Sequence, residues 1–309
     1  MEPILFETIP LETVWGGRKL REYFHFQDYS EFVGQTWCFA DQKGKSNRII
    51  NGRYKNLTLH DLWVNEPKLF KSKYMEFPFI IALLAPEDDL SIQVHPQDCY
   101  AKSKGYDSGK NEAWYFIEPP ENHYIVFGHT MKSYEELEKA IESHQIEKVL
   151  NYFSIQKKDY VYVPAGQIHA CTKGSIVYEI SQSTNITYRV YDYNRVDQNG
   201  NLRELHIDDA KACIQIPTVI DTVKQPKQVI ETESYILRIY NQQKDFLLKN
   251  VEIYDEYQCE EEKYQLVTVL YGHGTVNSYP IKIGDNFLIP ASSRTVYQGK
   301  LEIMIAMEM

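Results

Sequence analysis

The sequence predicts an all-β protein built from two related sandwich or barrel units, with a few short helices. Short runs rich in β-branched and aromatic residues recur along the chain, and turn residues separate them. Tyrosine is abundant, with 24 residues, and this residue favours strands over helices. A weak internal repeat also links the middle of the chain to its C-terminal part. We therefore expect strands to dominate the fold.

The expected strands follow one another closely between residues 79 and 193. Each run is four to eight residues long and ends near a proline, glycine or polar residue. In chain order the runs are FIIALL, SIQVHP, AWYFIE, YIVFG, YVYVP, SIVYEIS and ITYRVYDY.

Helices are expected near residues 57–70, 132–153 and 206–214. In the second of these segments, Leu137, Ile141, Val149 and Leu150 recur at roughly helical spacing. Ser133, followed three residues later by a glutamate, is typical of a helix start. Together the three segments predict a small helical insertion in the β fold.

The internal repeat divides the chain into two units. Residues 158–170 (KDYVYVPAGQIHA) align with residues 284–296 (GDNFLIPASSRTV) through an acidic residue, four strand residues and Pro-Ala. The first copy has His169 where the second has Thr295. Residues 216–234 carry two prolines and no sustained period, which is typical of a connector. We expect a catalytic, metal-binding domain over 1–220 and a second domain without metal ligands over 221–309.

Composition limits the partners. The 309-residue chain has a formal net charge of -10, which argues against binding to a nucleic-acid backbone but allows a small anionic substrate. Its five cysteines are scattered, as in a protein of a reducing compartment. The most apolar run, residues 77–86, is far shorter than the roughly 18 residues of a membrane span. We expect no signal peptide, because no basic-then-apolar leader precedes the first strands. We expect a cytoplasmic protein without nucleic-acid or membrane partners.

Four residues are candidate metal ligands. Gln93 and His95 lie two positions apart in a predicted strand and so share a face, while Glu112 begins the next strong strand. His169 follows a tight turn containing Pro164 and glycine. Imidazole, carboxylate and amide groups suit a divalent metal of the zinc type, and three strong ligands would leave a coordination position for substrate. The alternative is that these are separate, half-buried side chains, because such residues often occur without a metal.

Two cations are candidate catalytic residues. Arg189 lies in ITYRVYDYNR, where a guanidinium in a cleft could bind phosphate or stabilise developing negative charge. The alternative is an edge strand on which Arg189, Asp192 and Arg195 pair with one another. Lys110 precedes Glu112 by two positions and would share its face, although a solvent-exposed lysine is the alternative.

These motifs resemble a known family. PAGQIH, and SIQVHP followed by Glu112, are similar to the two metal-binding motifs of cupins. VWGG (residues 14–17), FPFIIALLAPEDDLSIQVHPQDCYA, GKNEAWYFI, VPAGQIHA and TYRVYDYNR, in this order, resemble the short bacterial type I mannose-6-phosphate isomerases. The resemblance continues through residues 203–210 and is far more specific than the cupin motifs alone.

The resemblance implies tandem cupin jelly-roll sandwiches and one Zn²⁺ per chain. It implies an aldose-ketose isomerase that interconverts mannose 6-phosphate and fructose 6-phosphate through a cis-enediol, with a phosphorylated hexose as its partner. The family's zinc ligands fall on His95, Glu112 and His169, with Gln93 as a further ligand in some members, and its catalytic arginine falls on Arg189. We expect Lys110 to add positive potential, and the chain to be a monomer or weak homodimer.

Two departures from the family pattern keep other functions open. Ala82 stands where the family usually has lysine, and Gln35 where it usually has glutamate. One alternative is a cupin that binds sugar phosphate without efficient catalysis, which ligand binding without turnover would reveal. The other is a different metal-dependent cupin enzyme, such as an iron oxygenase using two histidines and a carboxylate. Metal analysis and oxygen consumption would identify it.

Overall fold

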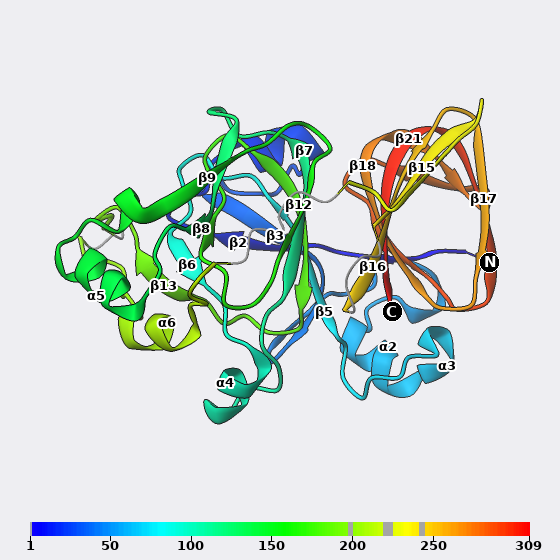
Figure 1. Ribbon diagram of the computed structural model, residues 1–309. Coiled ribbons are helices and arrows are strands. Elements are labelled where there is room, and N and C mark those ends of the chain that lie inside the picture. The colour runs from blue at the N-terminus through cyan, green and yellow to red at the C-terminus, as the bar shows by residue number, and fades with distance from the viewer. Residues whose placement is uncertain (1, 197–199, 219–224, 241–244) are drawn as a thin grey trace.

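Two β units lie side by side in the protein (Figure 1). The computed structural model describes residues 2–196, 200–218, 225–240 and 245–309, and within these ranges the strands form three antiparallel sheets. The predicted all-β class and tandem jelly-roll architecture are confirmed. The predicted domain boundary between residues 220 and 221 falls outside the described residues.

Two sheets form the N-terminal unit. In spatial order the larger sheet contains β10 (Tyr160–Val163), β7 (Glu112–Glu118), β12 (Ile176–Gln182), β5 (Phe79–Leu84), β3 (Val33–Gln42) and β2 (Ile9–Glu12), with β4 (Lys45–Ser46) paired to β3. The smaller sheet contains β13 (Tyr188–Tyr191), β6 (Ile92–Val94), β11 (His169–Ala170), β8 (Tyr124–His129) and β9 (Leu150–Ser154).

A single larger sheet forms the C-terminal unit. Its order is β1 (Ile4–Phe6), β20 (Asn286–Ile289), β18 (Gln265–Val276), β21 (Ser293–Glu308), β16 (Phe246–Ile253), β15 (Tyr235–Tyr240) and β14 (Gln228–Glu231), with β17 (Glu256–Glu261) on β21 and β19 (Tyr279–Lys282) on β18. Strand β1 joins this sheet by pairing with β20, so the N-terminus lies beside the C-terminal unit (Figure 1). The C-terminal sheet therefore includes a strand from the opposite end of the chain.

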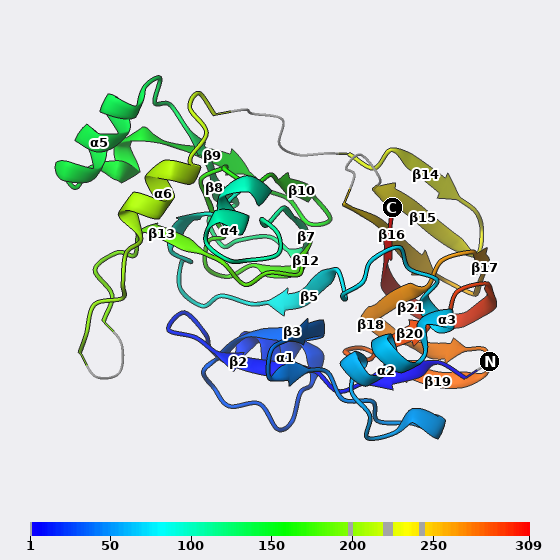
Figure 2. The same ribbon diagram turned by 90° about the horizontal axis from the view of Figure 1, so that it is seen from below.

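Short helices cover the ends of the sheets. They are α1 (Lys19–Phe24), α2 (Leu59–Asn65), α3 (Pro67–Phe70), α4 (Asp98–Ser103), α5 (Tyr134–Glu142) and α6 (Ile207–Cys213), with 3₁₀ turns η1 (Gly52–Tyr54) and η2 (Ile146–Val149). Seen from below, α4 lies across the end of the N-terminal unit, and α2 and α3 lie beside the C-terminal sheet (Figure 2). Helices α2, α3 and α6 form where the sequence predicts helix.

The helix expected over residues 132–153 ends earlier. Helix α5 begins after Ser133, whose side chain accepts a hydrogen bond from the Glu136 backbone N–H. It stops at Glu142, η2 follows, and Leu150 already belongs to strand β9, which pairs with β8. The apparent helical spacing of Val149 and Leu150 was misleading because the run LNYFS has a strand partner in the sheet.

Separate hydrophobic clusters fill the two units and the space between them. One cluster, which includes Trp37, Trp114, Phe127 and Val163, lies between the two N-terminal sheets. A second fills the C-terminal unit around Val267. A third takes residues from both units, including Ile81 and Tyr178 with Leu266 and Met304.

The sequence repeat corresponds to a repeated local structure. In each copy the acidic residue closes a turn: Asp159 Oδ2 accepts from the Gln156 backbone, and Asp285 Oδ2 accepts from the Lys282 backbone, each at 2.8 Å. A strand then runs to the proline, β10 in the first copy and β20 in the second. This likeness supports the proposal of two related units.

Candidate metal centre

The structure brings three of the predicted ligands together. His95, Glu112 and His169 are buried, and their potential ligand atoms all lie within 4.8 Å of one another. His95 Nε2 is 3.1 Å from one Glu112 oxygen, and His169 Nε2 is 3.3 Å from the other. The sheet order explains the meeting, because His169 on β11 pairs directly with Gln93 on β6, two residues before His95.

A tight turn ties His169 to His95. Gly166 has a φ of +89°, and a Cβ built on it would lie 2.4 Å from the Gln97 side-chain nitrogen. Its N–H donates to the carbonyl of His95 at 2.8 Å. The Pro-Ala-Gly turn therefore fastens the loop before His169 to the segment that carries the other imidazole.

Backbone carbonyls orient both imidazoles. His95 Nδ1 lies 2.8 Å from the carbonyl of Ile186, and His169 Nδ1 lies 2.9 Å from that of Gln167. A carbonyl only accepts, so each Nδ1 carries the proton and each Nε2 presents a lone pair to the cluster. Burial, together with the charge of Lys110, lowers the pKa of His95 to about 4 and favours its neutral form. Neutral Nε2 atoms are the form that binds a metal.

The donor atoms fit a divalent cation. His95 Nε2 and Glu112 Oε1 are buried and make no hydrogen bond of normal geometry, while Glu112 Oε2 has the Lys110 ammonium at 2.8 Å. Buried polar atoms without such partners are rare, and an ion held between them is one recognised cause. Two imidazole nitrogens and a carboxylate are typical ligands of a catalytic metal.

Gln93 lies next to this group. Its Nε2 is 3.4 Å from His169 Nε2, and its Oε1 accepts from the Ser91 hydroxyl at 3.2 Å. Gln93 therefore borders the group with its amide nitrogen toward His169, and its amide oxygen would reach the centre only if the amide turned over.

Lys110 lies between two buried carboxylates. Its Nζ is 2.8 Å from Glu112 Oε2 and 3.7 Å from Glu179 Oε1. Burial alone would lower the pKa of Lys110, but the two carboxylates outweigh it and keep the ammonium charged. Burial also opposes ionisation of Glu112, yet Lys110 and His95 hold the pKa of Glu112 well below its usual value. Lys110 and Glu112 thus point to the same side of the sheet, as the sequence predicts.

Glu179 is a site residue that we did not single out from the sequence. Its Oε2 accepts from Trp114 Nε1 at 3.1 Å, and burial raises its pKa to about 7, despite Lys110 and with a contribution from Glu112. A signal was available, because Glu179 is an acid inside the otherwise apolar strand IVYEISQ. An acid is rarely buried unless it is paired.

Arg189 lies beside the cluster but outside it. It pairs in register with Gln93, so both side chains lie on one face of the sheet. Its Nε is buried without a hydrogen bond, and burial with nearby Arg203 lowers its pKa. The sequence also allowed Arg189, Asp192 and Arg195 to pair with one another. Asp192 does bind Arg195, and also Arg203, but no ion pair joins Arg189 to a carboxylate in the described part of the chain.

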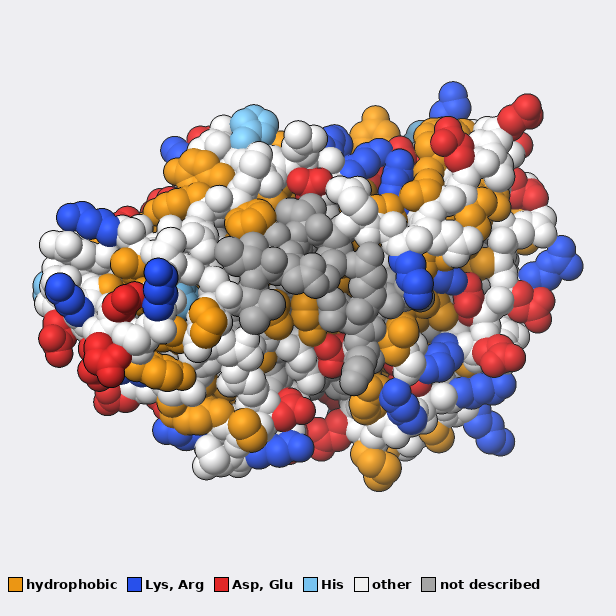
Figure 3. Space-filling model, in the orientation of Figure 1, with side chains coloured by type: hydrophobic (Ala, Val, Ile, Leu, Met, Phe, Trp, Pro, Cys, Tyr) orange, Lys and Arg blue, Asp and Glu red, His pale blue; other side chains and the backbone are white. Residues whose placement is uncertain are grey.

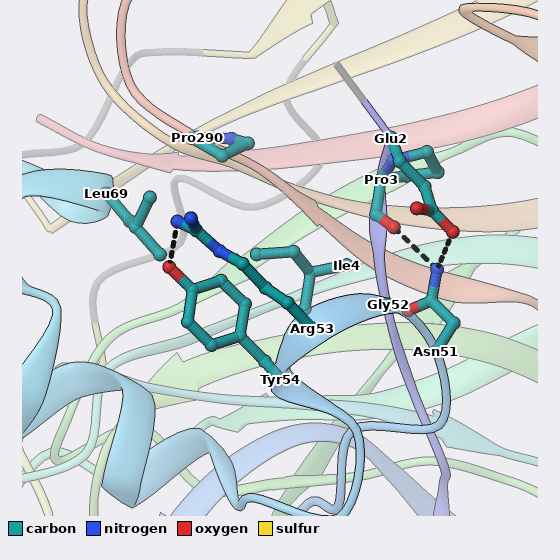
Figure 4. Close-up of a pocket in the computed structure, with 9 residues that line it drawn as sticks. All are labelled: Glu2, Pro3, Ile4, Asn51, Gly52, Arg53, Tyr54, Leu69 and Pro290. Carbon is teal, nitrogen blue, oxygen red and sulfur yellow. Dashed lines mark hydrogen bonds between the residues drawn. The ribbon is translucent and has the colours of Figure 1, made fainter.

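Two further cavities are lined by residues other than the three clustered side chains. A pocket of about 340 Å³ lies between β1, η1 and α3 (Figure 4). In its wall the Arg53 guanidinium lies over the Tyr54 ring, and the Asn51 side chain donates a hydrogen bond to Glu2. A more polar cavity of about 520 Å³ is lined by Arg189 and the segment after Asn185. On the face shown in Figure 3, acidic and basic side chains are interspersed around the rim.

The fold and the site define a class. Tandem jelly rolls with a buried His–Glu–His group are typical of a cupin protein that could bind a metal. The chain belongs to the type I phosphomannose isomerase family, whose catalytic-domain model matches residues 7–124.

Known relatives match over nearly the whole chain. A putative mannose-6-phosphate isomerase of Bacillus subtilis is 34% identical over 94% of this chain and 93% of its own length. The mannose-6-phosphate isomerase ManA of the same organism is 33% identical over 94% of this chain and 93% of its own. The crystal structure of the B. subtilis mannose 6-phosphate isomerase superposes with a TM-score of 0.93, at 32% identity and 99% coverage of both chains.

Within the described ranges, no helix is both long and apolar enough to cross a membrane.

Proposed function

We propose that this chain interconverts mannose 6-phosphate and fructose 6-phosphate as a zinc-dependent aldose-ketose isomerase. The observation that carries the proposal is the buried group of His95, Glu112 and His169, in a chain whose full-length relatives are named as this isomerase. One Zn²⁺ per chain would be held by these three residues, with Gln93 as a further ligand.

The reaction moves a proton between C1 and C2 through a cis-enediol, and negative charge develops on the substrate oxygens. When bound, the metal would supply Lewis-acid polarisation of the carbonyl oxygen. The protein must add positive potential and a group that carries the proton.

Side chains near the centre suit these roles. The Lys110 ammonium is buried and charged, so it can stabilise an enediolate oxygen. Arg189 has no carboxylate partner in the described ranges, so its guanidinium can stabilise the enediolate oxygen or bind the substrate phosphate. Glu179, with a pKa of about 7, can accept and return a proton at its carboxylate near neutral pH.

Metal removal tests the proposal. We expect the purified protein to contain about one zinc per chain, to lose turnover of mannose 6-phosphate in a coupled assay after chelation, and to recover it when zinc is added. Full activity in a rigorously metal-free sample would contradict the metal mechanism. Tight substrate binding without turnover in the zinc-loaded protein would favour a binding protein, and oxygen consumption an oxygenase.

The remaining expectations are proposals of the same kind. We propose that residues 1–220 form the catalytic, metal-binding domain, that residues 221–309 form a second cupin-like domain without metal ligands, and that the chain works in the cytoplasm as a monomer or weak homodimer. All five cysteines are free thiols, which supports a reducing compartment.

A further inference from the structure

One end of the larger N-terminal sheet carries a row of polar side chains. Lys110 precedes β7, Ser183 follows β12, and Gln42 ends β3, so all three lie at the end where the metal centre is located. Gln42 Nε2 donates to Ser183 Oγ at 3.0 Å, which joins two of these strands. Lys45 on β4 pairs in register with Gln42 and belongs to the same rim.

Lys45 faces the inner side of this rim. Ala40 contributes to the cluster between the two sheets, and Gln42, two residues further along β3, shares its face. Lys45 is the cross-strand partner of Gln42 and so lies on this face as well. Its Nζ is 5.8 Å from the centre of the Trp37 ring, which is 4% exposed and belongs to the same inner cluster.

The register then leads from Trp37 to the metal centre. Trp37 pairs with Ala82 on β5, and Ala82 pairs with Glu179 on β12. With strands about 4.8 Å apart, two strand spacings separate Trp37 from the strand of Glu179 by roughly 10 Å. A phosphorylated six-carbon chain is long enough to span this separation between Trp37 and the strand that carries Glu179 beside the metal centre.

Lys45 is exposed and makes no ion pair in the described part of the chain, although Asp41 and Glu76 line the same cavity. Lys110 is bound to Glu112 and Glu179, whereas no carboxylate lies within 4.0 Å of Lys45 Nζ in the described ranges. An ammonium held against an aromatic ring near a substrate site provides a ready partner for an anion. We infer that Lys45 binds the phosphate group of the sugar phosphate. The inference rests on the proposed function and identifies one substrate-binding residue that sets its preference for phosphorylated sugars.

Lys45→Gln tests the inference against two matched variants, Lys43→Gln in the same turn and Lys45→Arg. Because the phosphate is bound equally in ground and transition states, we expect Lys45→Gln to raise KM about tenfold with kcat little changed. Titration calorimetry with mannose 6-phosphate should show the same loss of affinity, which shrinks at high salt. Lys43→Gln should match the wild type, and Lys45→Arg should keep most of the affinity.

Unchanged KM and Kd in Lys45→Gln would overturn the inference, and so would a fall in kcat at constant KM or equal effects in Lys43→Gln. Thermal unfolding of each variant checks that the fold is intact. If the wild type binds mannose 6-phosphate without turning it over, and Lys45→Gln weakens that binding, the phosphate contact stands while the proposed isomerase function fails.

Discussion

At the residue scale, the two repeated units differ in the side chain at one equivalent position. His169 and Thr295 occupy equivalent positions after matching strands and Pro-Ala turns, and both are buried. The N-terminal copy gathers a second imidazole and an acid around this position. The C-terminal copy has a hydroxyl there, which is a poor ligand for zinc.

His169→Ala should therefore remove the metal, while Thr295→Ala should not. With one imidazole and one carboxylate left, we expect zinc affinity and turnover to fall at least about a hundredfold, since even outer-shell changes cost 10–100-fold. Elemental analysis after gel filtration and a coupled assay on the same sample measure both. Zinc retained at one per chain in His169→Ala would exclude this residue as a ligand.

Arg189→Ala probes charge without touching the metal group. Among the described residues the Arg189 guanidinium has no carboxylate partner to release. We therefore expect zinc content and thermal unfolding to stay the same while kcat falls about a hundredfold, the usual effect of losing an electrostatic donor. Arg53→Ala, which lies in the separate pocket of Figure 4, serves as the control. Equal kinetics in the two variants would remove Arg189 from the site.

At the element scale, the pairing of β3 with β5 explains why two departures from the family occur together. Gln35 pairs with Leu84 and Trp37 pairs with Ala82, so Gln35 and Ala82 are diagonal neighbours on one face. A glutamate and a lysine at these positions would face one another. Loss of both removes the pair, whereas loss of the lysine alone would leave the glutamate unpaired next to the core.

A double-mutant cycle tests this coupling. We expect Gln35→Glu and Ala82→Lys each to lower the free energy of unfolding by about 1–3 kcal/mol, because Gln35→Glu brings a new charge next to the core and Ala82→Lys places a long side chain at a fully buried position opposite Glu179. The double variant should be more stable than the sum of the two changes predicts, by at least about 1 kcal/mol. Urea denaturation of the four proteins gives the coupling. Strict additivity would show that the two positions do not interact.

Local sequence patterns predicted much of this fold but not its long-range pairings. Alternation and turn residues located the strands, and motif spacing located His95, Glu112 and His169. No local signal indicates that β1 pairs with β20, or that Lys45 lies over Trp37, because such contacts depend on how distant strands are ordered. Glu179 was missed for a related reason. Its partner Trp114 lies on β7 and its partner Lys110 lies in the segment just before β7, both far from Glu179 in the sequence.

At the scale of the whole molecule, the two units share a core and a set of polar contacts. Tyr115 Oη donates to Glu302 at 3.0 Å, and the rings of Tyr160 and Tyr240 stack with centroids 4.7 Å apart. The strand β1 and the cluster common to both units add to this interface. We therefore expect the chain to unfold as one cooperative unit rather than as two separate domains.

Glu252 tests the polar part of this interface. It lies on β16, and its carboxylate binds Lys158 of the N-terminal unit at 2.7 Å and also Arg238. Burial alone would raise the pKa of Glu252, but these two cations outweigh it and hold the pKa below its ordinary value of 4.5. Its contribution to stability is thus complete above the unfolded-state pKa and is lost as the pH falls through the folded-state pKa.

Glu252→Gln should lower the free energy of unfolding by about 1 kcal/mol at pH 7, a value suited to a partly exposed ion pair. The difference from the wild type should disappear at a pH below the folded-state pKa, where the wild-type carboxyl is also neutral. Glu260→Gln, at an exposed position on β17, should leave stability unchanged at both pH values. A difference that persists unchanged in acid would mean that Glu252 contributes through packing, and that the charge of Lys158 does not help to join the two units.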